Sequence, residues 1–209
     1  MEPSEVRQRA LAAIDAGDRP GLLALAEEWA GRSSRPTAAF AVDLLPYAEW
    51  EPRPVADPRT AGAEARMPIL MGIVEAEGPI LARRAFGLYT RASGGKKLTT
   101  AVKAPLAGAA WRLKIQGRLE IAREDATTID DDDVLRVAGG EPVSVRELGP
   151  RALDEVPLDE VAELMERLTA AGANDLKRAV LDTYGLVRLT AKADEYLELA
   201  IELASAPPR

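Results

Sequence analysis

The 209-residue sequence contains no cysteine and no histidine, and only 4% of its residues are aromatic. Without cysteine, the chain has neither disulfides nor thiolate chemistry. Without histidine, it lacks the usual general base and the commonest zinc ligand. With so few aromatic residues, the core must consist mainly of alanine, leucine, valine and isoleucine, which together with many Glu and Arg favours helices. We therefore expect a mainly α-helical protein that is not an enzyme.

Long apolar runs are also missing from the sequence. No run approaches 18 apolar residues, and the first 17 residues lack the apolar segment of a signal peptide. These features predict a soluble, cytoplasmic protein that does not contact a membrane.

Two short motifs are similar to ligand sites but lack the required spacing. Residues 94–99 (Gly-Gly-Lys-Lys-Leu-Thr) lack the first glycine of a phosphate-binding loop and the Ser or Thr that must directly follow its lysine. The four consecutive aspartates at 130–133 do not have the spacing of a calcium-binding loop. We therefore expect neither a cofactor nor a metal.

Charge is distributed unevenly along the chain. Acidic residues outnumber basic ones by 34 to 27, and the net charge of −7 argues against general binding of polyanions. However, residues 78–119 hold nine basic side chains and no acidic one, and the segments on both sides are acidic. Because polyanions respond to the local field, this segment is the strongest functional signal in the sequence.

The spacing of apolar residues predicts three helices followed by a β-hairpin in residues 63–149. The expected elements are helices at 64–77, 80–86 and 96–116, the last kinked near Pro105, and strands at 118–123 and 134–138. This is the element order of a winged helix-turn-helix domain.

The rest of the chain extends this organisation. Residues 1–45 predict a helical segment, with helices at 4–16, 21–31 and 37–45, and residues 46–62 predict a proline-rich strap. Residues 150–209 form a second, acidic module with helices at 158–171, 174–184 and 191–204 and no room for a wing. Arg84-Ala85 and Arg178-Ala179 occupy similar places in the two modules, which indicates a diverged duplication. The expected fold is thus a pair of tandem winged-helix-like modules.

Several motifs, in order, resemble an uncharacterised bacterial domain. Residues 73–80 (Ile-Val-Glu-Ala-Glu-Gly-Pro-Ile) carry the resemblance, and residues 142–146, 156–160 and 185–188 match later segments. That domain lies at the C-terminal end of large superfamily 1 DNA helicases with a restriction-endonuclease-like nuclease. The resemblance covers roughly residues 45–204 and implies a role in DNA processing, repair or defence. This chain has Leu81 where the family usually has histidine, and it lacks the helicase and nuclease portions, so an accessory role is expected.

Basic side chains gather on one face of the helix predicted at 96–116, opposite an apolar face formed by Leu98, Val102, Pro105, Ala109 and Leu113. In a winged helix, this basic face is offered to the major groove, where lysine and threonine contact phosphates. If six cations engaged phosphates, the salt slope of binding would be about −5. The predicted DNA-binding residues are Arg83, Arg84, Arg91, Lys96, Lys97, Thr100, Lys103, Lys114 and Arg118.

Other interpretations of the basic segment remain open. It could bind an acidic protein partner, as in an interaction adaptor, or pair with acidic segments of its own chain. The loop at 124–133 holds six carboxylates, and it either points away from DNA or covers the basic face. A homodimer or a helicase or nuclease partner is also conceivable. We expect Tyr47, Trp50 and Trp111 to pack within the protein rather than to bind a ligand.

Overall fold

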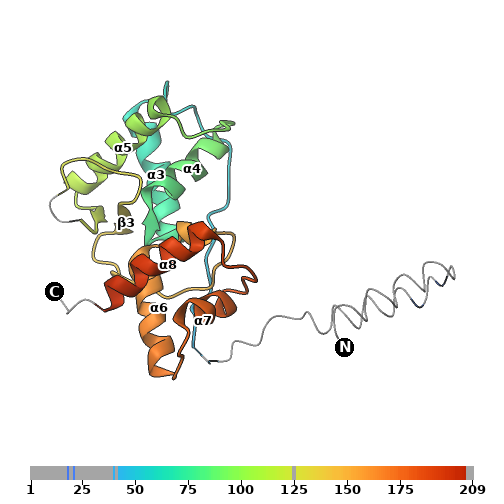
Figure 1. Ribbon diagram of the computed structural model, residues 1–209. Coiled ribbons are helices and arrows are strands. Elements are labelled where there is room, and N and C mark those ends of the chain that lie inside the picture. Colours follow the sequence, from blue (N-terminus) through green and yellow to red (C-terminus); the bar gives the residue numbers. More distant parts are fainter. Residues whose placement is uncertain (1–17, 19–20, 22–39, 41, 124–125, 206–209) are drawn as a thin grey trace.

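The computed structural model describes residue positions 18, 21 and 40 and the segments 42–123 and 126–205. The helices predicted at 4–16 and 21–31 lie outside the described residues, except for position 21. The described segments form two lobes, each built around its own apolar core (Figure 1). The protein is mainly helical, as predicted, with one small antiparallel sheet.

The first lobe contains three helices and all three strands. Its elements are α3 (Ala63–Glu77), β1 (Ile80–Leu81), α4 (Ala82–Ala92), α5 (Thr100–Ile115), β2 (Leu119–Ile121) and β3 (Val134–Val137). The strands form a sheet in the order β1-β3-β2, in which Ile80 pairs with Leu135 and Glu120 with Arg136. The predicted helix at 64–77 and the predicted hairpin are confirmed, since both hairpin strands lie within their expected ranges.

Two helix boundaries in this lobe were wrong. The helix predicted at 80–86 begins two residues later, because Ile80 and Leu81 form a strand, and it continues through Gly87 to Ala92. The helix predicted from 96 begins at Thr100, because Gly94 adopts a left-handed conformation with φ of 80° and Thr99 is extended. Lys96 and Lys97 therefore lie in the loop before α5.

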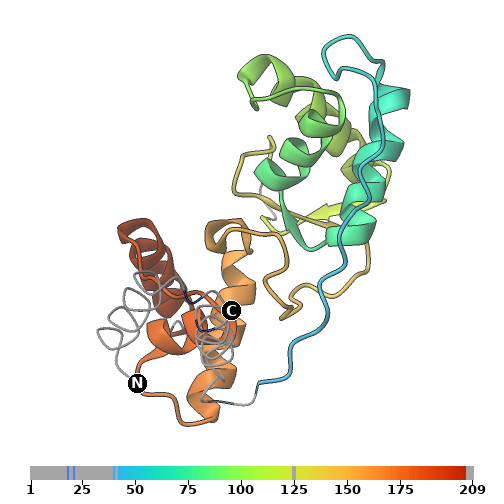
Figure 2. The same ribbon diagram turned by 90° about the vertical axis from the view of Figure 1, so that its right-hand side faces the viewer.

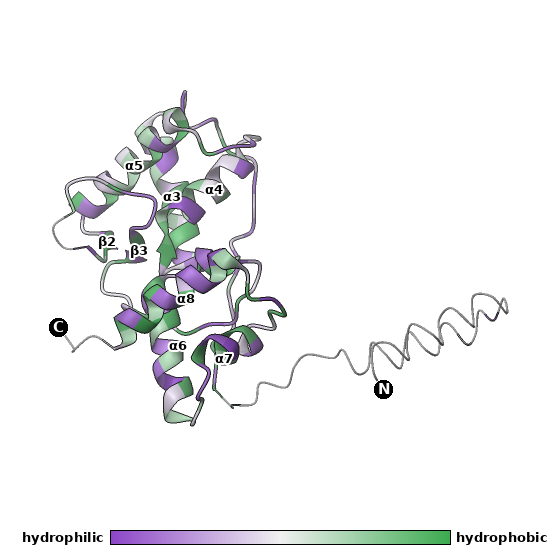
Figure 3. Ribbon diagram, in the orientation of Figure 1, coloured by the Kyte–Doolittle hydropathy of each residue, from purple (hydrophilic) through white to green (hydrophobic). Residues whose placement is uncertain are grey.

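The second lobe consists of the helix set that the sequence predicted. It contains a short 3₁₀ turn η1 (Leu153–Glu155), followed by α6 (Leu158–Ala170), α7 (Leu176–Thr183) and α8 (Ala191–Ala204). Figure 3 shows hydrophobic and hydrophilic residues alternating along α6 and α8, as expected for helices that bury one face. The side chains of Asp175 and Thr190 cap α7 and α8 by accepting hydrogen bonds from backbone N–H groups.

The strap extends along the first lobe (Figure 2). The indole of Trp50 is buried in the core of that lobe, and Val55 donates a backbone hydrogen bond to Ala92. The expectation that Trp50 packs within the protein is confirmed. The helix predicted at 37–45 is wrong for residues 42–45, which are not helical, because Leu45 pairs with Arg146 in an isolated parallel bridge. In the described part of the chain, no helix is both long and apolar enough to cross a membrane.

Candidate nucleic-acid interface

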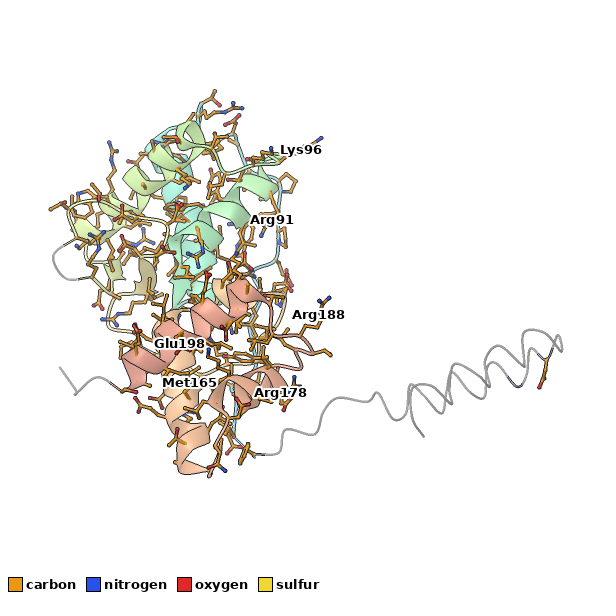
Figure 4. All side chains as sticks on the ribbon, viewed as in Figure 1. Arg91, Lys96, Met165, Arg178, Arg188 and Glu198 are labelled. Atoms are coloured by element: carbon orange, nitrogen blue, oxygen red, sulfur yellow. The ribbon has the colours of Figure 1, made fainter. Side chains whose placement is uncertain are left out.

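The predicted DNA-binding side chains fall into three structural groups. The first group is exposed and has no ion-pair partner among the described residues. It contains Arg91, Lys96 and Lys97 before α5 and Arg118 after it, and Thr100 is exposed at the start of α5. Figure 4 shows Arg91 and Lys96 projecting toward the same side of the first lobe. Arg112, which the prediction omitted, is also exposed on α5 and has no charge partner among the described residues.

The second group is covered by an acidic segment, Asp130–Asp133. Lys103 forms an ion pair with Asp131, and Arg83 forms one with Asp132. Lys114 donates to the carbonyl of Ala126 at 3.4 Å, and its ammonium lies 4.7 Å from the centre of the Trp111 ring. The lysine side of α5 was predicted to be its outermost face. It instead lies against the segment that follows β2.

The outermost face of α5 carries mostly small residues and one arginine. Thr100, Ala104, Gly108 and Arg112 follow one another at helical spacing and are exposed, and Ile115 at the end of the helix is 72% exposed. The predicted apolar face is confirmed for Val102, Ala109 and Leu113, which are buried, and Leu98 packs against the core from the loop before α5. Leu106 and Ala110 complete the buried face, whereas Pro105 is only partly buried.

Hydrogen bonds hold both end residues of the acidic segment, Asp130 and Asp133, in place. Asp133 is nearly buried and accepts hydrogen bonds from Arg123 and from the backbone N–H of Asp130. Burial opposes ionisation of the Asp133 carboxyl, but these hydrogen bonds outweigh it, so that the pKa of Asp133 is lowered. The backbone N–H of Arg83 also donates to the carbonyl of Asp131. Of the two alternatives for these acids, the structure thus shows that they cover part of the basic face.

Arg84 forms the third group and corrects the prediction. Its side chain is 3% exposed, and its guanidinium donates to Glu77 and Glu155, each at 2.8 Å. Arg84 therefore lies between the lobes and is not available on the surface. No local pattern indicates this burial, because Glu155 lies 71 residues away and belongs to the other lobe.

Arg84 belongs to a buried charge network that joins the lobes. Glu160, which is 1% exposed, accepts hydrogen bonds from both Arg146 and Arg151. The guanidinium of Arg146 also donates to the backbone carbonyls of Glu77, the last residue of α3, and of Pro79 just beyond it. These carbonyls lack partners within the helix, so a side chain from the second lobe completes the end of a helix in the first.

Tyr47 covers this network from the strap. The centroid of its ring lies 4.3 Å from the guanidinium carbon of Arg151 and 5.4 Å from that of Arg146, and its hydroxyl donates to Glu77. Burial, followed by the hydrogen bond to Glu77, raises the pKa of Tyr47 above its ordinary value. The ring is thus packed within the protein, as expected. Because every charge is paired, we assign this network a structural role.

A scan against models of protein families found no match, and searches of curated proteins and of solved structures found no similar protein. The resemblance to the helicase-associated domain therefore stays a prediction. Among the described residues, no group of His, Cys, Asp or Glu is arranged to hold a metal ion.

Proposed function

We propose that the first lobe is a winged-helix-like module and that the protein is a non-catalytic DNA-binding accessory protein. The element order helix, strand, helix, helix, hairpin supports this assignment. So does the strand order, because β1 pairs with β3 of the hairpin rather than with the neighbouring β2. In this arrangement α5 takes the place of the recognition helix and the hairpin that of the wing.

The observation that carries the proposal is a cluster of unpaired cations at the start of α5. Arg91 lies in the last turn of α4, and Lys96 and Lys97 occupy the loop that leads into α5. No acidic side chain lies in the first turn of α5, whose N-terminal N–H groups favour a phosphate. Lysine and arginine at this position can contact the DNA backbone, and the Thr100 hydroxyl can add a further hydrogen bond.

The acidic segment limits how many cations take part. Lys103 and Arg83 are engaged by Asp131 and Asp132, so the available set is Arg91, Lys96, Lys97, Arg112 and Arg118. If all five contacted phosphates, the slope of log affinity against log salt would be about −4.5. Binding should therefore be detectable at low salt and weak at physiological salt.

Fluorescence anisotropy with labelled duplex and single-stranded DNA at two salt concentrations tests the proposal. Lys96→Glu combined with Lys97→Glu should weaken binding at least tenfold, because two phosphate contacts become repulsive. The matched control reverses two exposed charges of the second lobe, Arg167→Glu and Arg188→Glu, and should change affinity less than threefold.

Absence of binding at low salt, or an equal effect of the two double variants, would refute the proposal. If polyglutamate bound with the same affinity and salt slope as DNA, an acidic protein would become the preferred partner of the basic loop.

A further inference from the structure

A groove of about 970 Å³ lies between the two lobes. The acidic segment and β3 bound it on the side of the first lobe, and α6 and α8 bound it on the other side. Its apolar surface includes Val134 from β3, Leu158 from α6, and Tyr196 and Leu199 from α8. Leu199 is 51% exposed, although leucine side chains on a helix that packs against a core are usually buried. An apolar groove of this size can accommodate one or two turns of a peptide.

Helix α8 presents this apolar surface between carboxylates. Glu195, Leu199 and Glu202 are all exposed and are spaced four and three residues apart, so they share one face of the helix. No described element packs over Leu199 at the centre of this face. An amphipathic helix can lay its apolar face on such a surface, and basic residues at its edges would complement the two acids.

The charge balance of the groove is negative. Six carboxylates and three cations line it, and each cation already has an acidic partner: Arg83 with Asp132, Arg123 with Asp130 and Asp133, and Lys192 with Asp154. The remaining carboxylates, Asp159 and Glu195, form no ion pair with a cation among the described residues. A nucleic acid or a small anion would be repelled here, whereas lysine or arginine would be attracted.

We propose that this groove is the docking site for a basic, leucine-bearing helical segment of a partner protein. An apolar side chain of the segment covers Leu199, and flanking lysine or arginine side chains pair with Glu195 and Asp159. The proposal is independent of DNA binding, because none of the unpaired cations at the start of α5 lines the groove.

Fluorescein-labelled peptides of 14 residues provide the probe, with the full-length protein as receptor. The first peptide places leucine along one helical face and lysine at both edges. A second replaces each leucine by serine, and a third replaces each lysine by glutamate. Only the first should bind with micromolar or tighter affinity, because the second lacks the apolar face and the third carries the wrong charge.

Variants of the groove locate the site. Leu199→Ser and Glu195→Lys should each weaken binding of the first peptide at least tenfold, and both positions are exposed, so neither change disrupts a core. Glu75→Lys on the exposed surface of α3 makes the same charge change as Glu195→Lys and should leave affinity within twofold. A photoreactive group on a central leucine of the peptide should crosslink to residues 195–202 or to residues 130–134.

Equal weakening by Glu75→Lys and Glu195→Lys, equal binding of the serine peptide, or crosslinks confined to other residues would overturn the proposal. Sedimentation of the protein alone tests a second copy as occupant. Concentration-dependent association that Leu199→Ser abolishes, together with no binding of the first peptide, would assign the groove to self-association and refute a basic partner.

Discussion

Neutralising the acidic segment should strengthen DNA binding. In a variant with Asp131→Asn and Asp132→Asn, the ion pairs with Lys103 and Arg83 are lost, while Asp130 and Asp133 keep their bonds to Arg123. Asparagine has nearly the shape of aspartate, and the backbone carbonyl of Asp131 can still accept from Arg83. The side chains of Lys103 and Arg83 then lose their acidic partners and can turn to phosphates, although Arg83 keeps its hydrogen bond to the backbone carbonyl of Asp154.

The magnitude follows from the cost of breaking these pairs. Surface ion pairs contribute up to about 1 kcal/mol each, so removing both should increase affinity by up to about 2 kcal/mol, or roughly thirtyfold. Two additional phosphate contacts should also steepen the salt slope from about −4.5 to about −6.3.

Anisotropy titrations of duplex DNA at several salt concentrations measure both quantities. The control variant, Glu49→Gln with Glu141→Gln, makes the same change in net charge at exposed positions that form no ion pair among the described residues, and it should alter affinity about twofold or less. If the control raised affinity as much as the aspartate variant, or if the salt slope did not change, the acidic segment would not be masking cations.

Three further predictions concern stability. Glu160→Ala should lower the free energy of unfolding, measured by urea titration, by about 3–5 kcal/mol, because it leaves buried arginines unpaired. Glu163→Ala removes a surface ion pair and should lower it by less than about 1 kcal/mol. Similar losses in the two variants would contradict the structural role of the network. Gly149→Ala should cost about 1–3 kcal/mol, because φ is 57° and the added Cβ would meet the Tyr47 ring at 2.6 Å; an unchanged melting temperature would disprove the contact. The pKa of the Tyr47 hydroxyl is raised in the folded protein, so its contribution to stability should be fully present below pH 10 and should be lost as the pH rises above 10. Tyr47→Phe should therefore flatten the fall of the urea midpoint between pH 9 and 11.

Local patterns predicted the helices with the clearest apolar spacing. Helix α3 was found because Met67, Leu70, Met71 and Val74 recur at helical intervals before a Gly-Pro pair, and these four residues are buried in the structure. The first strand was missed because Ile80 and Leu81 look like the start of a helix. Their strand conformation depends on pairing with β3, far along the chain, which no local window contains.

The candidate site was predicted only in part, because local patterns show where cations occur but not which of them the fold leaves exposed. The excess of cations before and within α5 is a local property, so Lys96, Lys97 and Arg91 could be identified directly. Whether a particular cation is exposed depends on which acid reaches it through the fold. The sequence could not distinguish Arg84 from Arg91, because the partner of Arg84 is supplied partly by the second lobe.

The bonds from Arg146 to the end of α3 have a consequence for how such a chain can be rearranged in evolution. Each lobe has its own core, so the two look like interchangeable modules that recombination could separate or shuffle. Yet a copy of the first lobe inherited alone would lose the side chain that satisfies the carbonyls of Glu77 and Pro79. We therefore expect recombination to transfer the two lobes together, because separating them would leave this helix end without its side-chain donor.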